Sequence, residues 1–448
     1  MPRLALSMIV KNAAATIEEC LISVRGVVDE IVVADTGSTD ETIEIARRAG
    51  ARVISIAWED DFSRARNLSL AETTADWVLS LDADERLDPG ASNELPGVLD
   101  GTNFWGFQTP IRNYVRDPAM KIWDRAARPN DGSYLPARAF PAYIEHENVR
   151  LFRRHPDIYF TGRVHETVGW RIRETGRTLG AVRTPIHHFG MAWESSEARF
   201  QKIVFYRELG RKKLEETPEN AQAHFEFGLV EMENFGEVGK ALPSFERACQ
   251  LDASLGAAWF FAGACHFQLG NHARALYFLQ HAEDVGHLTP GVAELLGDTN
   301  YKLGNYETAG NCYRRGLKRL PSSAFLESKL GLAEARTGNS RSGLRRLRHA
   351  LTLEASNPDL HDRLISVEVW LGHLEQAGEA AERKLGAVAA GPNDYLRAAS
   401  IRAEAKKWEH AKEILQRGVT LFPEAELLRI SLSKIELLSN TSHEITTH

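Results

Sequence analysis

Short apolar runs alternate with amphipathic stretches over the first 100 residues. The runs at residues 4–10, 30–34, 52–57 and 77–81 are rich in β-branched residues, and helical patterns at 15–27, 39–49 and 63–73 separate them. Strands that alternate with helices at this spacing are typical of βαβ units, in which helices cover both faces of a largely parallel sheet. We therefore predict an α/β domain with a Rossmann-like mixed sheet.

The pattern changes between residues 101 and 189. Strand-like pieces at 106–111, 149–152, 158–161 and 179–183 stand between irregular segments. The segment 116–140, rich in Pro, Arg, Asp and Gly, predicts a long loop. Loops of this length inside a compact domain usually are functional lids or mobile segments.

A repeat of 34 residues dominates the rest of the chain, after one predicted helix over 195–216. Glycines mark the period at Gly236, Gly270, Gly304, Gly338 and Gly372. A small residue follows five positions later in each unit, at Ala241, Ala275, Ala309, Gly343, Ala377 and, in a sixth unit, Ala411. Glycine ends the first helix of a pair, and small residues let paired helices approach closely. The sequence therefore predicts an all-α solenoid.

These patterns divide the chain into four segments. We expect an α/β domain at 1–193, a linking helix at 194–221, six repeats at 222–425, and a capping helix and tail at 426–448. The period and the small residues resemble tetratricopeptide repeats. The large aromatic residue usual in their first helix is present in three units, as Phe225, Trp259 and Tyr395.

Composition narrows the classes of partner and compartment. The formal charge of −7 argues against a protein that binds a nucleic-acid backbone. No run approaches the roughly 20 apolar residues that cross a bilayer, so we expect no transmembrane segment. The four cysteines lie far apart without a CxxC pair, which argues against a structural zinc site and favours a reducing cytoplasm.

Two carboxylates follow the apolar run that ends at Leu81. Alternation along a strand puts Asp82 and Asp84 on the same side, at the carboxyl end where open α/β sheets bind ligands. Paired carboxylates suit Mg²⁺ or Mn²⁺, and such a cation neutralises a diphosphate. The simpler alternative is an acidic boundary between a strand and a turn.

Two further segments carry polar residues at expected strand or helix ends. Asp35 ends a predicted strand, where it faces the ligand side or forms an Asx turn. Residues 60–67 open a helix whose first turn carries Arg66 and Asn67. These two side chains either hold a phosphate and a base or lie on the solvated surface.

Together these segments resemble the family 2 glycosyltransferases, which have the GT-A fold. The motifs are MIVKN at 8–12, ADTGSTD at 34–40, DDF at 60–62 with ARN at 65–67, and LDADE at 81–85. They are most similar to a bacterial branch that ends in tetratricopeptide repeats and includes peptide glycosyltransferases of the bacteriocin type. The resemblance implies a nucleoside-diphosphate sugar donor, commonly linked to UDP, and Mn²⁺ or Mg²⁺ as cofactor.

The resemblance also implies roles for individual residues. The donor-binding set is Val10, Lys11, Asn12, Asp35, Asp61, Arg66, Asn67, Asp82 and Ala83. Within it, Asp35 would accept a hydrogen bond from the base, and Arg66 would reach the base or the diphosphate. Asp82 would contact the ribose or the metal shell, and Asp84 would ligate the metal directly.

Two later motifs resemble elements of the same branch. Residues 160–166 end in His165-Glu166, and residues 186–191 read IHHFGM. Glu166 is the implied general base of an inverting displacement, with Asp84 at the same catalytic centre, and His188 completes the metal ligands. The alternatives are a His165-Glu166 pair that only shapes the pocket and a histidine that lies in the core or contacts substrate.

Processive members of this fold carry a QxxRW motif, which this sequence lacks. We therefore expect a single or limited transfer to a protein or peptide, with the repeats docking the acceptor or forming a homodimer. Two alternatives stay open at this point. One is transfer to a lipid-linked or surface glycan, and the other is an inactive repeat scaffold.

Overall fold

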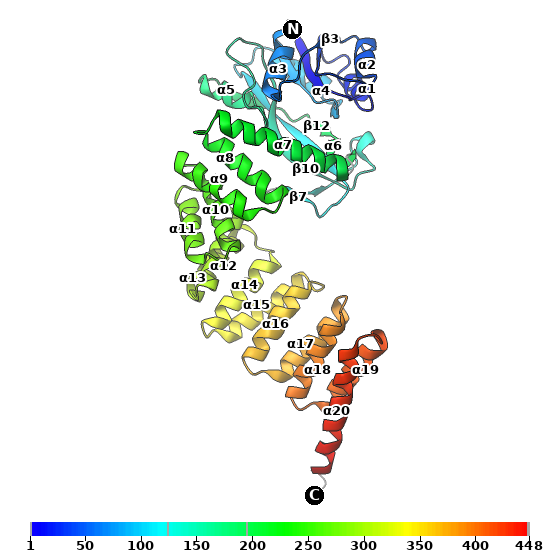
Figure 1. Cartoon of the computed structure of the whole chain (residues 1–448), viewed down its shortest axis with the longest axis vertical. Helices are drawn as coiled ribbons and strands as arrows, with labels where there is room; N and C mark the ends of the chain where they lie inside the picture. Colours follow the sequence, from blue (N-terminus) through cyan, green and yellow to red (C-terminus); the bar gives the residue numbers. More distant parts are fainter. Residues whose placement is uncertain (1, 123–124, 194–195, 446–448) are drawn as a thin grey trace. The chain divides into compact units, whose positions relative to one another are not determined.

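The computed structural model describes residues 2–122, 125–193 and 196–445. The chain divides into two compact units, Met1–Val230 and Glu231–His448. The first is an α/β unit with a mixed sheet and the second consists of paired helices (Figure 1). The predicted fold class is therefore confirmed.

A sheet of ten strands forms the centre of the first unit as far as it is described. Eight strands lie in the order β3-β2-β1-β4-β10-β6-β12-β5, while β11 pairs with β6 and β9 with β10. The bounds are β1 Leu4–Val10, β2 Glu30–Asp35, β3 Arg52–Ser55, β4 Trp77–Ser80, β5 Glu85–Leu87, β6 Gly106–Val115, β9 Arg128–Pro129, β10 Ala142–Arg153, β11 Leu179–Ala181 and β12 Ile186–His188. Strands β3, β2, β1 and β4 are parallel, as predicted, and β10 joins β4 in the antiparallel direction.

Helices connect and flank these strands. They are α1 Ile17–Ser23, α2 Thr42–Arg48, α3 Phe62–Ala71, α4 Ala91–Leu99, α5 Gly169–Glu174, α6 Gly190–Trp193, α7 Ser196–Glu216 and α8 Ala221–Leu229. The core lies between the sheet and α1, where Leu6, Met8 and Leu79 are almost fully buried. Burial of β1 and β4 on both faces explains their continuous apolar runs.

The region 116–161 differs from its prediction in two places. The expected long loop contains the short hairpin of β7 (Lys121–Ile122) and β8 (Arg125–Ala126), strand β9 and a 3₁₀ turn at Leu135–Ala137. The predicted strand at 158–161 has only one isolated bridge, at Thr161. The side chain of Asn67 takes the place of a strand partner there, because it bonds both the N–H (2.8 Å) and the carbonyl (2.9 Å) of Phe160.

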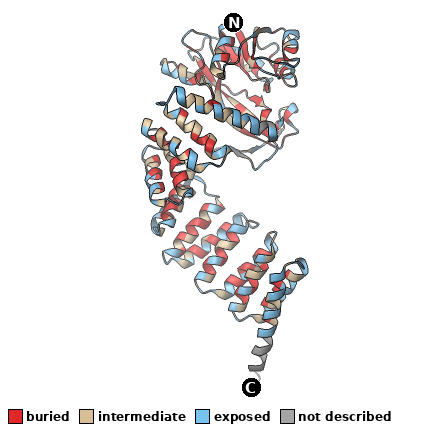
Figure 2. Ribbon diagram, viewed as in Figure 1, coloured by how far each residue is buried: buried red, intermediate tan, exposed pale blue. Residues whose placement is uncertain are grey.

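The second unit continues the predicted repeat. After a π-helical turn at Val230–Asn234, the helices are α9 Val238–Leu251, α10 Gly256–Gln268, α11 His272–Asp284, α12 Pro290–Lys302, α13 Tyr306–Arg319, α14 Ala324–Arg336, α15 Ser340–Leu353, α16 Pro358–Trp370, α17 Leu374–Ala387, α18 Pro392–Glu404, α19 Trp408–Leu421 and α20 Glu426–Ile445. Figure 2 shows buried residues recurring in the helix pairs. None of the helices in the described ranges has the length and apolar character needed to cross a membrane.

The periodic glycines end the first helix of each pair. All five have positive φ, between 67° and 88°, which is the left-handed conformation that glycine adopts without strain. The small residue at Gly343 serves a close approach of α14 and α15, since a Cβ there would lie 2.5 Å from the carbonyl oxygen of Gly331. In the sixth unit Lys406 occupies the glycine position, with φ of 57°.

The boundary between the units differs from the expected domain limits. We expect the first domain to end at residue 193, whereas α7 and α8 group with the first unit, up to Val230. The reason is that α7 packs against α8 and lines the cavity described below.

Candidate functional site

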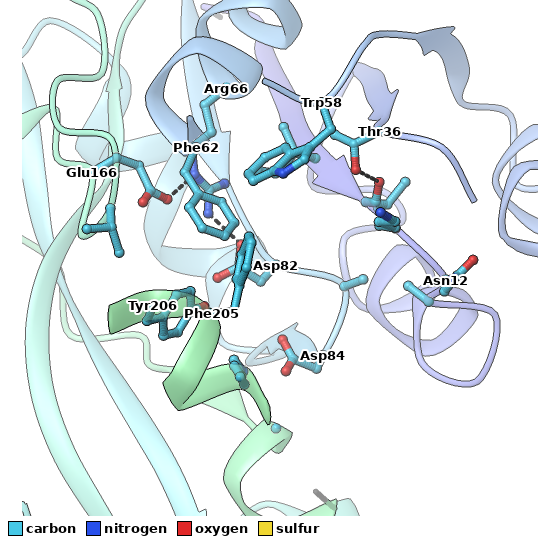
Figure 3. A pocket seen from close by; sticks show the side chains of 18 of the residues that line it. Asn12, Thr36, Trp58, Phe62, Arg66, Asp82, Asp84, Glu166, Phe205 and Tyr206 are labelled. Carbon is cyan, nitrogen blue, oxygen red and sulfur yellow. Dashed lines mark hydrogen bonds and ion pairs between the residues drawn. The ribbon is translucent and has the colours of Figure 1, made fainter. Parts of the chain in front are cut away.

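A cavity of about 900 Å³ opens at the carboxyl ends of the parallel strands of the first unit. Its walls are the end of β1, the turns after β2 and β4, residues 164–166, and helices α6 and α7 (Figure 3). It brings together nine predicted site residues, namely Val10, Lys11, Asn12, Arg66, Asp82, Ala83, Asp84, Glu166 and His188. Motifs that are up to 178 positions apart therefore meet in one place.

Asp35, Asp61 and Asn67 do not line this cavity, and the structure uses their side chains elsewhere. The buried carboxylate of Asp35 accepts hydrogen bonds of 3.0 Å from the backbone N–H groups two and three positions later. Asp61 caps α3 through the N–H three positions later, also at 3.0 Å. Asn67 holds the backbone of Phe160. Each of the three thus stabilises the local chain, and their roles toward a donor stay predictions.

Asn12 joins the ends of β1 and β2. Its backbone has a left-handed φ of 51°. Its N–H donates to the Ser38 hydroxyl (2.9 Å), and its side-chain oxygen accepts from the N–H of Thr39 (2.8 Å). These bonds hold the turn after β2 beside residues 10–12, so that the backbone there forms one edge of the cavity.

Five charged side chains of alternating sign form a chain of ion pairs beneath the cavity. Arg66 contacts Glu166 at 2.5 Å and Asp82 at 2.6 Å (Figure 3). Arg150, on β10, contacts Asp82 at 3.3 Å and Glu85 at 2.8 Å. Every charge has an opposite neighbour, which is what buried ions require. Glu166 and Asp82 are thereby held at fixed positions on either side of Arg66.

This arrangement explains the shifted ionisation of two carboxyls. Burial alone would raise the pKa of Asp82, but the charges of Arg66 and Arg150 hold it far below its usual range. Burial raises the pKa of Glu85 to about 7 despite the charge of Arg150. Glu85 also accepts a 2.8 Å bond from the N–H of Asp82, which fixes the turn after β4.

A second cluster lies on the other side of that turn. Oδ2 of Asp84 is 3.2 Å from Nε2 of His188, and Nδ1 of His188 is 2.6 Å from Oδ1 of Asn113. Burial lowers the pKa of His188, but the hydrogen bond and charge of Asp84 outweigh it, so the pKa is raised. The ring of His188, from β12, is therefore held against a carboxylate from the turn after β4.

Asp84 and His188 fit a divalent cation as neighbouring ligands. Octahedral Mg²⁺ has ligands at about 2.1 Å, which places adjacent ligand atoms about 3 Å apart. Asp82, which we also expect among the ligands, has both carboxylate oxygens bound to arginines instead. The described residues contain no group of three His, Cys, Asp or Glu side chains spaced for a metal. Phosphate and water would supply the remaining ligands, as is common for Mg²⁺.

Aromatic side chains form a wall of which the sequence motifs contain only Phe62. Trp58 and Phe62 precede and open α3, and Phe205 and Tyr206 come from α7. Ring centroids lie 4.9 Å apart for Trp58 and Phe62 and 5.9 Å for Phe62 and Tyr206. Figure 3 shows these rings around the Arg66–Asp82 pair. One signal in the sequence could have indicated this wall, namely the aromatic residues that interrupt the otherwise charged sequence of α7. Some of these rings are exposed in the structure.

Two family matches cover parts of the chain. Residues 6–159 match "Glycosyl transferase family 2", and residues 236–316 match "Anaphase-promoting complex, cyclosome, subunit 3". Glu166, His188 and α7 thus lie beyond the first matched segment.

Curated relatives resemble the chain over limited segments. A TPR (tetratricopeptide) repeat-containing protein of Synechococcus elongatus is 35% identical over 44% of this chain and 45% of its own length. An uncharacterized glycosyltransferase of Rickettsia felis is 36% identical over 23% of this chain and 36% of its own length. The SPbeta prophage-derived glycosyltransferase SunS of Bacillus subtilis is 25% identical over 37% of this chain and 34% of its own length. The chain spans less than half the length of these relatives.

Among solved structures, YrrB, a TPR protein with an unusual peptide-binding site, is similar with a TM-score of 0.38 and 19% identity, over 45% of this chain and 99% of its own. A tetratricopeptide repeat protein from Parabacteroides merdae has a TM-score of 0.40 and 15% identity, over 53% and 93%. The first unit thus contains a segment that matches the family 2 glycosyltransferases, with its motifs at one cavity, and the second unit consists of 34-residue helix pairs similar to tetratricopeptide repeats.

Proposed function

We propose that this chain transfers a sugar from a nucleoside-diphosphate sugar, most simply UDP-linked, to a protein or peptide. The observation that supports this is the convergence of Asp82, Asp84, His188 and Glu166 on one cavity at the carboxyl ends of the parallel strands. A volume of about 900 Å³ suits a nucleotide sugar together with part of an acceptor.

On the donor side, the backbone of residues 10–12 lies along the nucleotide, and Asp82 accepts from the ribose. Asp84 and His188 hold Mn²⁺ or Mg²⁺. When bound, the cation supplies Lewis-acid stabilisation of the charge on the departing diphosphate. The ion pairs of Asp82 with two arginines keep its carboxylate ionised and fixed, so the ribose meets an already oriented acceptor.

On the acceptor side, Glu166 is the general base of an inverting displacement. Its Oε1 is held by Arg66, and the second carboxylate oxygen is left for the acceptor proton. The rings of Phe62, Phe205 and Tyr206 pack against the acceptor residue beside the attacking atom. We assign the repeats to acceptor docking, since such arrays bind extended peptides.

The donor half of the proposal is tested by release of nucleoside diphosphate from a panel of nucleotide sugars with Mn²⁺. We expect turnover or slow hydrolysis that Asp84→Ala abolishes and that Asp100→Asn leaves intact, because Asp100 is exposed at the end of α4. Equal rates in wild type and Asp84→Ala would refute the metal assignment. No release with any donor would refute the activity and favour a binding scaffold.

The acceptor half needs a different readout. Intact-mass analysis of neighbouring gene products, co-expressed with the chain, should show a gain of one sugar on a protein. A gain on a lipid-linked glycan and on no protein would refute the protein acceptor. Loss of the protein gain on deletion of residues 231–448, with donor hydrolysis retained, is the result expected if the repeats dock the acceptor.

A further inference from the structure

The His188 ring is held by a chain of hydrogen bonds that crosses three neighbouring strands. Oδ1 of Asn113, on β6, lies 2.6 Å from Nδ1 of His188, on β12. Nδ2 of the same amide donates to the carbonyl of Ile144 at 3.0 Å and lies 2.9 Å from Nδ1 of His146, both on β10. Because β6 lies between β12 and β10, one buried amide contacts both neighbours.

The chemistry of these partners determines where the protons lie. A backbone carbonyl only accepts, so the end of the Asn113 amide that faces Ile144 must be the NH₂ group. The amide oxygen then faces His188. Since that oxygen also only accepts, Nδ1 of His188 must carry a proton. The opposite tautomer would set two lone pairs against each other at 2.6 Å.

We propose that Asn113 is a positioning residue, which orients His188 and keeps the ring proton on Nδ1 by accepting its hydrogen bond, so that Nε2 can offer a lone pair to a divalent cation beside Asp84. This inference rests on the proposed function, because it takes the cation from there. Nε2 already points at Oδ2 of Asp84, 3.2 Å away. Asn113 itself is only 7% exposed and does not line the cavity.

Mn²⁺ binding to the full chain, measured by electron paramagnetic resonance, tests this directly. Asn113→Leu removes the oxygen and should weaken Mn²⁺ binding about 10- to 100-fold, the range seen for residues that orient a metal ligand. Asn113→Asp keeps an oxygen toward His188, and as a buried neutral carboxyl its O–H can donate to the Ile144 carbonyl in place of the amide, so this variant should restore binding to within a few-fold. Thr109→Val is the matched control, because the buried Thr109 hydroxyl on the same strand has no hydrogen-bond partner in the described residues. Equal losses in the Leu and Asp variants, or wild-type binding by Asn113→Leu, would overturn the proposal.

A second measurement does not depend on the cation. In ¹⁵N-histidine-labelled Asp84→Ala protein, the carboxylate no longer competes for the ring protons. At about pH 9, where a histidine is neutral, His188 should be protonated on Nδ1, and adding Asn113→Leu should shift the proton to Nε2. An Nε2-protonated ring in Asp84→Ala would overturn the inference. If wild type binds no Mn²⁺ but this tautomer is found, the cation of the proposed function is wrong and the positioning role of Asn113 stands.

Discussion

Replacement of Arg66 by methionine should destabilise the first unit more than any single change on its surface. Arg66 is 6% exposed and makes ion pairs with Glu166 and Asp82 at 2.5 and 2.6 Å. Methionine fills much of the volume but leaves both carboxylates without this cation. Asp82 retains Arg150 at 3.3 Å, whereas Glu166 has no other ion-pair partner in the described residues.

The expected loss follows from this burial. Breaking a buried ion pair from one side costs about 3–5 kcal/mol, because the partner charge stays in place. Since Arg150 still compensates Asp82, we expect a loss of about 3–4 kcal/mol for Arg66→Met. For a unit of this size, that corresponds to a fall in Tm of roughly 10 °C.

Hydrogen exchange read by mass spectrometry isolates the first unit within the full chain, through peptides that cover β1 and β4. The matched control is Arg52→Met. Arg52 also contacts two carboxylates, Glu30 at 3.3 Å and Glu72 at 2.8 Å, but its side chain is 46% exposed. Exposed pairs contribute about 0–1 kcal/mol. If the protection free energies of Arg66→Met and Arg52→Met agree within about 1 kcal/mol, burial does not make the Arg66 ion pairs more stabilising than exposed ones, and the reasoning is refuted.

Three further predictions concern the repeats and the acceptor side. Gly372→Ala should destabilise the repeats by about 1 kcal/mol in urea unfolding, since alanine is strained at a φ of 77°, and Lys406→Gly should stabilise them by a similar or smaller amount; a loss for Lys406→Gly would contradict this. Phe205→Ala should raise the KM for a peptide acceptor more than the KM for the donor. A larger rise in the donor KM would refute the assignment of Phe205 to the acceptor side. Glu166→Gln should lower transfer about 10²- to 10⁴-fold at saturating donor, whereas a larger effect of His165→Gln would move the role of base to His165.

The repeats and the parallel half of the sheet were predictable because their signals are local. The 34-residue spacing predicts that Gly236 to Gly372 lie at helix ends without information from other parts of the chain. The continuous apolar runs of β1 and β4 likewise indicate buried strands by their composition alone. Asp84 was predicted from its place after a buried strand, whereas Glu166 and His188 were predicted through family resemblance. That they share a cavity follows from the structure.

Other parts of the site depend on pairings between distant strands. Arg150 reaches Asp82 only because β10 is inserted beside β4, and Asn113 reaches His188 only because β6 pairs with β12. Neither contact can be predicted from the spacing of residues in the sequence. Asn67 shows a different difficulty, since an asparagine at a helix start serves a ligand or a backbone equally well, and its partner Phe160 is 93 positions away.

The position of α7 has a practical consequence for expression and for biosynthesis. A fragment cut at the end of the matched segment, residue 159, would retain Asp82 and Asp84 but lose Glu166, His188 and the rings of α7. During synthesis the cavity is likewise incomplete until Tyr206 has left the ribosome, although β1 to β4 are available much earlier. The smallest part of this chain worth assaying for donor binding therefore extends through α8, to Val230.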